Sequence, residues 1–86
     1  MTVDEQIAML HATIVMYHAN NPDQRYGQAA YNCIDMLNPE FIPDIWTSNI
    51  DPFFNNGCVD DFLLYIAQRR LGVAPNPEPI IKDGMI

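Results

Sequence analysis

The sequence predicts an all-α fold, in which a small helical hairpin is followed by an irregular, aromatic-rich connection, a third helix and an extended tail. Three observations support this prediction. Apolar residues recur at steps of three and four in three stretches, which is the period of one helix face. Helix-capping residues bracket these stretches, and 49% of the 86 residues are hydrophobic. A chain of this length forms one domain, which we place at residues 1–72, with the tail at residues 73–86.

The first helix is expected over residues 3–19. Thr2 and Glu5 have the spacing of a capping box, in which each side chain accepts a hydrogen bond from the backbone N–H of the other residue. One apolar stripe then follows at helical spacing: Val3, Ile7, Leu10, Ile14 and Tyr17.

The second helix is expected over residues 22–37. Asn21 is a favourable N-cap and Pro22 suits the first helical position. The helix is expected to end at Asn38, because a residue that precedes proline avoids the helical region. The short link between the two predicted helices favours an antiparallel hairpin.

The connection over residues 41–54 is rich in aromatic and large aliphatic side chains but contains Pro43 and Pro52. Proline prevents a long helix here, so we expect short turns, with Asp51 capping a turn at Pro52. Two interpretations remain open for this segment: a lid that closes the core over the helices, or an exposed aromatic patch that binds another protein.

The third helix is expected over residues 58–70, after a turn at residues 55–57. Acidic residues lie at its start and basic residues at its end, as the helix dipole favours. Gly72 is a favourable residue just beyond the helix, where a left-handed conformation is common.

The net charge is −7, from four basic and eleven acidic residues. No basic residue lies between Arg25 and Arg69, whereas six acidic residues do: Asp35, Glu40, Asp44, Asp51, Asp60 and Asp61. Such a charge repels nucleic-acid phosphates and attracts basic protein surfaces. We therefore expect no direct binding of DNA or RNA, and no stretch is apolar enough to predict a membrane span.

Residue types that carry chemistry are present, but their spacing is unfavourable. His11 and His18 are separated by about 10.5 Å along a helix, which is too far for one metal ion. Cys33 falls on an apolar stripe, and Cys58 precedes acidic residues that raise a thiol pKa. Whether the two cysteines form a disulfide is left open. We expect no catalytic residue, no metal site and no cofactor.

Part of the chain, from Arg25 to Leu64, carries a recognisable pattern of the form RxGQxxxN…DPF. Its residues are Arg25, Gly27, Gln28, Asn32, Asp51, Pro52 and Phe53. The pattern resembles that of small uncharacterised proteins of bacteriophages and mobile elements. The resemblance implies a phage accessory protein acting in the cytoplasm of a bacterial host, and it implies no particular activity.

The same motif has a physical interpretation. Gly27 costs about 1 kcal/mol relative to alanine inside a helix, so we expect it to let the 51–54 turn lie against that helix. Gln28 and Asn32 lie four residues apart on one helix face, and we expect them to hydrogen-bond the backbone of the turn.

The leading hypothesis is a non-enzymatic protein that binds and blocks a basic, nucleic-acid-handling or defence protein of the host. The expected binding residues are Asp35, Glu40, Asp44, Trp46, Asp51, Phe54, Asp60 and Asp61. The alternative is a homo-oligomeric binder of a small molecule such as a nucleotide signal, with phosphate contacts from Arg25, Arg69 and Arg70. A virion role and self-association of the chain also remain open.

Overall fold

A computed structural model describes residues 1–73, and these residues form an all-α fold, as predicted. The elements are α1 (Val3–Asn20), α2 (Tyr26–Leu37), the 3-10 turn η1 (Pro39–Phe41), α3 (Ile42–Ile45), the 3-10 turn η2 (Asn56–Cys58) and α4 (Val59–Leu71). The predicted tail at 73–86 lies, apart from its first residue, outside the described residues. No helix within 1–73 is both long and apolar enough to cross a membrane.

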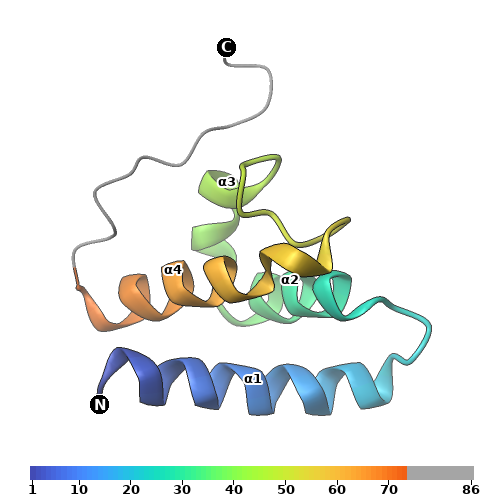
Figure 1. Ribbon diagram of the computed structural model, residues 1–86, viewed down its shortest axis with the longest axis horizontal. Helices are drawn as coiled ribbons and strands as arrows, with labels where there is room; N and C mark the ends of the chain where they lie inside the picture. Colours follow the sequence, from blue (N-terminus) through green and yellow to red (C-terminus); the bar gives the residue numbers. More distant parts are fainter. Residues whose placement is uncertain (74–86) are drawn as a thin grey trace.

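Helix α1 lies along one side of the molecule and packs against both α2 and α4, while α3 and the loop that follows lie on the opposite side (Figure 1). The apolar stripes of these helices meet in one core. The buried members of that core are Leu10, Ile14, Ala30, Cys33, Ile34, Ile45, Val59, Phe62, Leu63, Ile66 and Ala67.

The predicted capping box at the start of α1 and the predicted glycine at the end of α4 are confirmed. The Thr2 backbone N–H donates to Glu5 Oε1 at 2.8 Å, and the Glu5 N–H donates to Thr2 Oγ1 at 3.1 Å. At the end of α4, Gly72 adopts the left-handed conformation with φ +69°. Helix α4 begins at Val59, one residue later than expected, because the preceding residues form η2.

The predicted start of the second helix is wrong. Residues 21–25 form the link, and α2 begins at Tyr26. Asn21 does not cap α2, because its side-chain amide donates to the carbonyl of Tyr17 at 2.9 Å and so closes the end of α1. Instead, the backbone N–H of Gly27, in the first turn of α2, donates to Asn56 Oδ1 at 2.8 Å, and these two residues are 29 positions apart in the sequence. A distant residue therefore supplies the cap that the local sequence was expected to supply.

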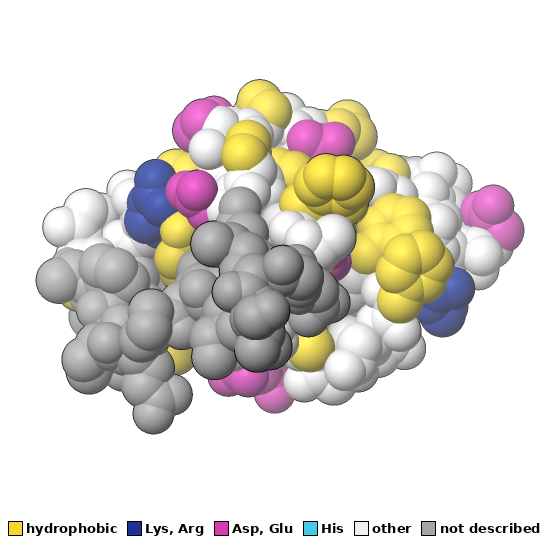
Figure 2. Space-filling model, turned by 90° about the horizontal axis from the view of Figure 1, so that it is seen from above, with side chains coloured by type: hydrophobic (Ala, Val, Ile, Leu, Met, Phe, Trp, Pro, Cys, Tyr) yellow, Lys and Arg dark blue, Asp and Glu magenta, His cyan; other side chains and the backbone are white. Residues whose placement is uncertain are grey.

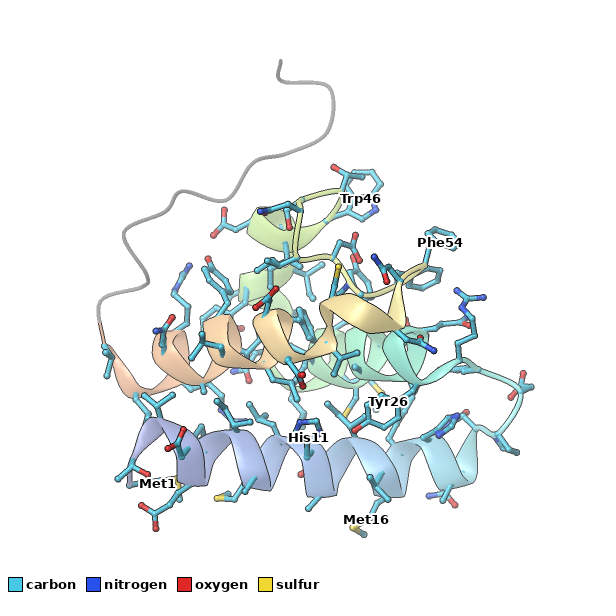
Figure 3. The ribbon with its side chains drawn as sticks, viewed as in Figure 1. Met1, His11, Met16, Tyr26, Trp46 and Phe54 are labelled. Carbon is cyan, nitrogen blue, oxygen red and sulfur yellow. The ribbon has the colours of Figure 1, made fainter. Side chains whose placement is uncertain are left out.

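The aromatic-rich segment is divided between the core and the surface. It forms η1, α3 and an irregular loop, in agreement with the expected short turns. Ile45 and Pro52 are fully buried and fix the segment to the helices. Trp46 and Phe54 are exposed on the side of the molecule away from α1 (Figure 3). The lid and the aromatic patch are thus two parts of one segment.

Candidate functional site

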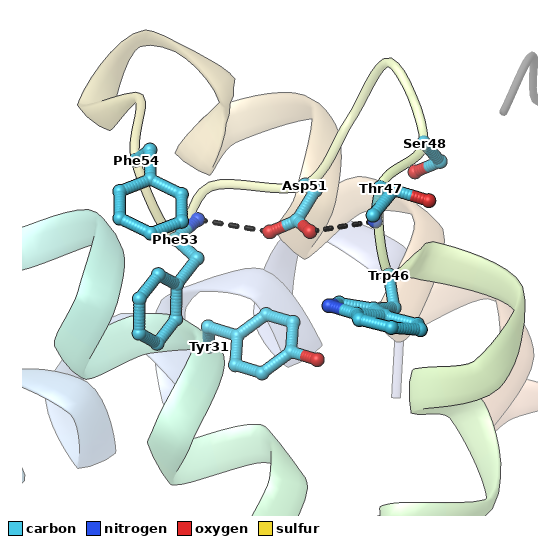
Figure 4. Close-up of a pocket in the computed structure, with 7 residues that line it drawn as sticks. All are labelled: Tyr31, Trp46, Thr47, Ser48, Asp51, Phe53 and Phe54. Carbon is cyan, nitrogen blue, oxygen red and sulfur yellow. Dashed lines mark hydrogen bonds between the residues drawn. The ribbon is translucent and has the colours of Figure 1, made fainter. Parts of the chain in front are cut away.

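A pocket of about 310 Å³ opens in the loop between α3 and η2. Aromatic side chains form most of its wall, together with one carboxylate and the hydroxyl groups of a threonine and a serine (Figure 4). The described residues that line it are Tyr31, Trp46, Thr47, Ser48, Asp51, Phe53 and Phe54. This volume lies near the lower limit of about 300–1,000 Å³ for ligand pockets, so the pocket fits a small group such as one side chain.

Trp46 and Phe54 form the two exposed edges of the pocket. Trp46 is 64% exposed and Phe54 is 84% exposed. On the face that carries them, two groups of hydrophobic side chains lie close together, with acidic side chains beside one group and a basic side chain beside the other (Figure 2). Large aromatic rings exposed in this way are typical of protein-binding surfaces.

Asp51 holds the loop between the two exposed rings. Its Oδ2 accepts a hydrogen bond from the Thr47 N–H at 2.8 Å, and its Oδ1 accepts one from the Phe53 N–H at 2.9 Å. The second bond confirms the predicted Asp51 turn at Pro52. One carboxylate thus binds the backbone next to Trp46 and next to Phe54. It therefore fixes the distance between the two edges of the pocket.

Thr47 is strained. Its φ of +61° is unfavourable for a β-branched residue, and such strain persists only where surrounding contacts enforce it. Here the hydrogen bond to Asp51 and the burial of Ile45, two residues before Thr47, enforce it. The chain reverses direction at this point, which places Trp46 at the surface directly after a fully buried residue.

Packed rings form the opposite wall of the pocket, and an arginine that does not line the pocket supports them. Phe53 lies edge-on to Tyr31, with ring centroids 5.3 Å apart, and also contacts Phe54 at 4.7 Å. The Arg25 guanidinium donates to the carbonyl of Phe53 at 2.6 Å and lies 5.5 Å from the centroid of the Phe54 ring. Arg25 therefore links the start of α2 to the loop.

Gly27 performs the role that the motif predicted. A Cβ atom at this position would overlap the carbonyl oxygen of Pro52 and lie 2.8 Å from Asn56 Oδ1. The loop can thus pack directly on the backbone of α2. The expectation for Gln28 and Asn32 is wrong, because the Asn32 amide donates to Gln24 Oε1 at 3.3 Å and no hydrogen bond joins Gln28 to the loop within the described residues. Two other side chains join the loop to the helix. Arg25 donates to the carbonyl of Phe53 in the loop, and Asn56 accepts a hydrogen bond from the Gly27 N–H at the start of α2.

The acidic residues expected at the binding surface lie in different surroundings. Asp51 lines the pocket, whereas Asp44 pairs with Arg69 at 3.3 Å. Glu40 accepts a hydrogen bond from Asn38, which lowers its pKa. Asp60 lies 3.9 Å from His11 of α1, and Asp35 and Asp61 are exposed on α2 and α4. The acidic charge is therefore spread over the molecule, and the aromatic rings are what define the site.

The histidines and cysteines are engaged or buried elsewhere. His11 Nδ1 lies 3.0 Å from the Tyr26 hydroxyl, and His18 Nε2 donates to the carbonyl of Gln24 at 2.7 Å. Both cysteines are free thiols. Burial raises the pKa of Cys33, and burial followed by the charges of Asp61 and Asp51 raises that of Cys58. Within residues 1–73, no three potential metal-binding side chains gather into one site.

Tyr31 was not predicted as a site residue, although the sequence carried a signal for it. It is a large ring on the polar side of α2, beside Gln28, Asn32 and Asp35, where a core residue would not be expected. Thr47 and Ser48 carried no comparable signal.

Comparisons with protein-family models, curated proteins and solved structures gave no match. The resemblance to phage proteins thus remains a prediction.

Proposed function

We propose that this chain is a non-enzymatic binding protein that docks a basic partner protein on the surface formed by Trp46 and Phe54. The observation that supports this most is the exposure of both rings on a loop held by internal hydrogen bonds. Exposed Trp and neighbouring aromatic residues supply much of the binding energy in protein interfaces. A loop that is already ordered loses little further conformational entropy when a partner binds.

The net charge of −7 favours a basic partner and repels nucleic acid. Together with the resemblance to phage accessory proteins, this charge favours a nucleic-acid-handling or defence protein of a bacterial host as the target. In this proposal the chain acts by occupancy: it covers a basic surface that would otherwise contact phosphate groups.

The test uses the immobilised full chain and a bacterial lysate at low and at physiological salt. Wild type and the control variant Met36→Ala are expected to retain the same basic protein, and the double variant Trp46→Ala/Phe54→Ala is expected to lose it. Met36 is a matched control because it is 71% exposed and does not line the pocket.

The purified partner must then release its nucleic acid when the chain is added. Retention that is independent of Trp46 and Phe54, or a retained protein that is acidic, would refute the proposal.

The alternative of a phosphate-binding small-molecule receptor is less well supported. Arg25 donates to Phe53, and Arg69 is held by Asp44 and Tyr65, so both guanidinium groups already have partners. In addition, the basic side chains visible on the aromatic face lie at separate ends of it (Figure 2). Mass spectrometry of small molecules released from the purified chain tests this alternative directly.

Self-association remains a second prediction. Met9, Val15 and Met16 are exposed on α1, and no Asp, Glu, Lys or Arg occurs between Gln6 and Asn20. Copies that each carry a charge of −7 repel one another least along such an uncharged stretch. Sedimentation of the full chain at increasing ionic strength measures this association, and Met16→Glu is expected to prevent it.

A further inference from the structure

Arg69 is a cation held between aromatic rings and a carboxylate. The Arg69 guanidinium lies 4.9 Å from the ring centroid of Phe41 and 5.6 Å from that of Tyr65. Its Nη1 also donates to the Tyr65 hydroxyl at 2.6 Å and to Asp44 Oδ2 at 3.3 Å. The faces of aromatic rings attract cations, and the carboxylate supplies the counter-charge. This arrangement joins η1 and α3 to α4.

The pocket beside Trp46 has the same chemical components. Four aromatic residues line it together with Asp51, and the described lining residues include no lysine or arginine. Figure 4 shows the Asp51 carboxylate between the Trp46 ring on one side and the Phe53 and Phe54 rings on the other. The two backbone N–H groups bound to Asp51 fix the position of its carboxylate.

Two negative charges lie near the Tyr31 phenol and contribute to its raised pKa. Burial raises it first, and the negative charges of Asp51 and Asp35 raise it further. Both charges disfavour a phenolate, and by the same electrostatics they stabilise a cation placed beside the ring.

We propose that the pocket receives the side chain of one lysine or arginine of a basic partner protein, with its cationic group against the face of Trp46 and near Asp51. The inference rests on the proposed function and names the chemical group that this site would recognise. The pocket volume of about 310 Å³ suits one extended side chain, and tryptophan is the aromatic residue that attracts cations most strongly.

The first test titrates the full chain with a capped pentapeptide that has arginine between two pairs of glycines. The matched peptide replaces arginine by citrulline, which keeps the planar shape and loses the charge; a lysine and norleucine pair makes the same comparison. In NMR spectra, the Trp46 indole N–H and the Thr47 amide are expected to shift and to saturate. The charged peptides are expected to bind at least about fivefold more tightly than the neutral ones.

The second test changes the electronics of Trp46 without changing its shape. Because Trp46 is the only tryptophan, growth with fluorinated tryptophans modifies this ring alone, and its exposure leaves room for fluorine. Fluorine withdraws electron density from the ring face, so affinity for the arginine peptide is expected to fall stepwise, by about three- to tenfold in total. Met36→Ala is expected to leave the affinity unchanged.

Three results would overturn the cation pocket: equal affinity for the citrulline peptide, affinity that fluorination leaves unchanged or increases, or shifts centred away from Trp46. These outcomes are separate from those of the proposed function. If Trp46→Ala/Phe54→Ala releases the partner while fluorination has no effect, the docking surface stands and the cation pocket falls. If the arginine peptide binds as expected but no basic protein depends on these rings, the cation pocket stands and the proposed function falls.

Discussion

Gly27 and the carbonyl group of Pro52 touch so closely that no side chain fits between them. This contact brings the loop that carries Trp46 and Phe54 onto the backbone of α2. It also places Asn56 where its side chain caps that helix at 2.8 Å from the Gly27 nitrogen. One residue without a side chain thus supports both the start of a helix and the position of the pocket.

The variant Gly27→Ala is expected to lower the free energy of unfolding by about 1–3 kcal/mol. Alanine is the better helix former, but its Cβ meets backbone atoms that cannot move away cheaply. Urea denaturation followed by circular dichroism measures the change. Gly57→Ala is the control, because there the Cβ would meet only the side chain of Asn55, at 3.1 Å. A Gly27→Ala variant as stable as wild type would contradict this account of the contact.

The variant Asp51→Asn is expected to lower the free energy of unfolding by about 1–2 kcal/mol. Asparagine is uncharged and has one acceptor oxygen, so one of the two N–H groups now bound by Asp51 loses its acceptor and the other keeps only a neutral one. Asp44→Asn changes the same charge at a solvent-exposed ion pair and is expected to cost less than about 0.5 kcal/mol. Equal losses in the two variants, measured by urea denaturation, would argue against the role assigned to Asp51.

The variant Thr47→Gly is expected to be as stable as wild type or more stable, by up to about 1 kcal/mol. Glycine adopts positive φ without a steric penalty, and this gain opposes its larger entropy in the unfolded chain. Thr47→Ala keeps a Cβ and is expected to show no gain. Thermal unfolding compares the three proteins, and a clear loss of stability in Thr47→Gly would show that the threonine side chain has a structural role.

The capping box predicts a pH dependence with a definite sign. The pKa of Glu5 lies below its ordinary value, because the Thr2 backbone N–H and then the Thr2 hydroxyl favour the charged carboxylate. The stabilisation is therefore complete above the pKa of the unfolded chain and is lost as the pH falls through the lower, folded value. Carbon-13 NMR titration of the Glu5 carboxyl group measures the shift. Glu5→Gln is expected to remove this part of the acid dependence, and an unshifted Glu5 would contradict the capping box.

The two thiols are expected to react slowly with iodoacetamide at neutral pH. Each has a raised pKa, so little of the reactive thiolate is present. Cys33 is buried and Cys58 is half-buried, so mass spectrometry of the labelled peptides is expected to find Cys58 modified first. The chain unfolded in urea serves as the reference for full reactivity. Rapid labelling of Cys33 in the native protein would indicate that the core opens readily.

The helices that the sequence predicted best are those whose ends depend on near neighbours. The capping box of α1 joins residues three positions apart, and the end of α4 depends on the conformational freedom of Gly72. The charge pattern of α4 and the apolar stripe of α1 are equally local. Such signals can be recognised without knowledge of the rest of the chain.

The start of α2 and the pocket depend on residues that are far apart in the sequence. Asn21 could have served either helix, and only the packed structure shows that it ends α1 while Asn56 caps α2. Likewise, composition alone could not divide the aromatic segment between core and surface. Ile45 and Pro52 are buried against the helices, and the backbone reversal at Thr47 then leaves Trp46 outside.

The sequence by itself determined the helical class and the two helices with strong caps, because each follows from local backbone preferences. It also indicated a close approach at Gly27, because glycine is unfavourable inside a helix. The tertiary structure alone decided which rings face solvent and that Tyr31, Trp46, Asp51 and Phe54 surround one pocket. The physical reason is that burial and long-range hydrogen bonds are shared among segments. Their outcome depends on how the whole chain packs.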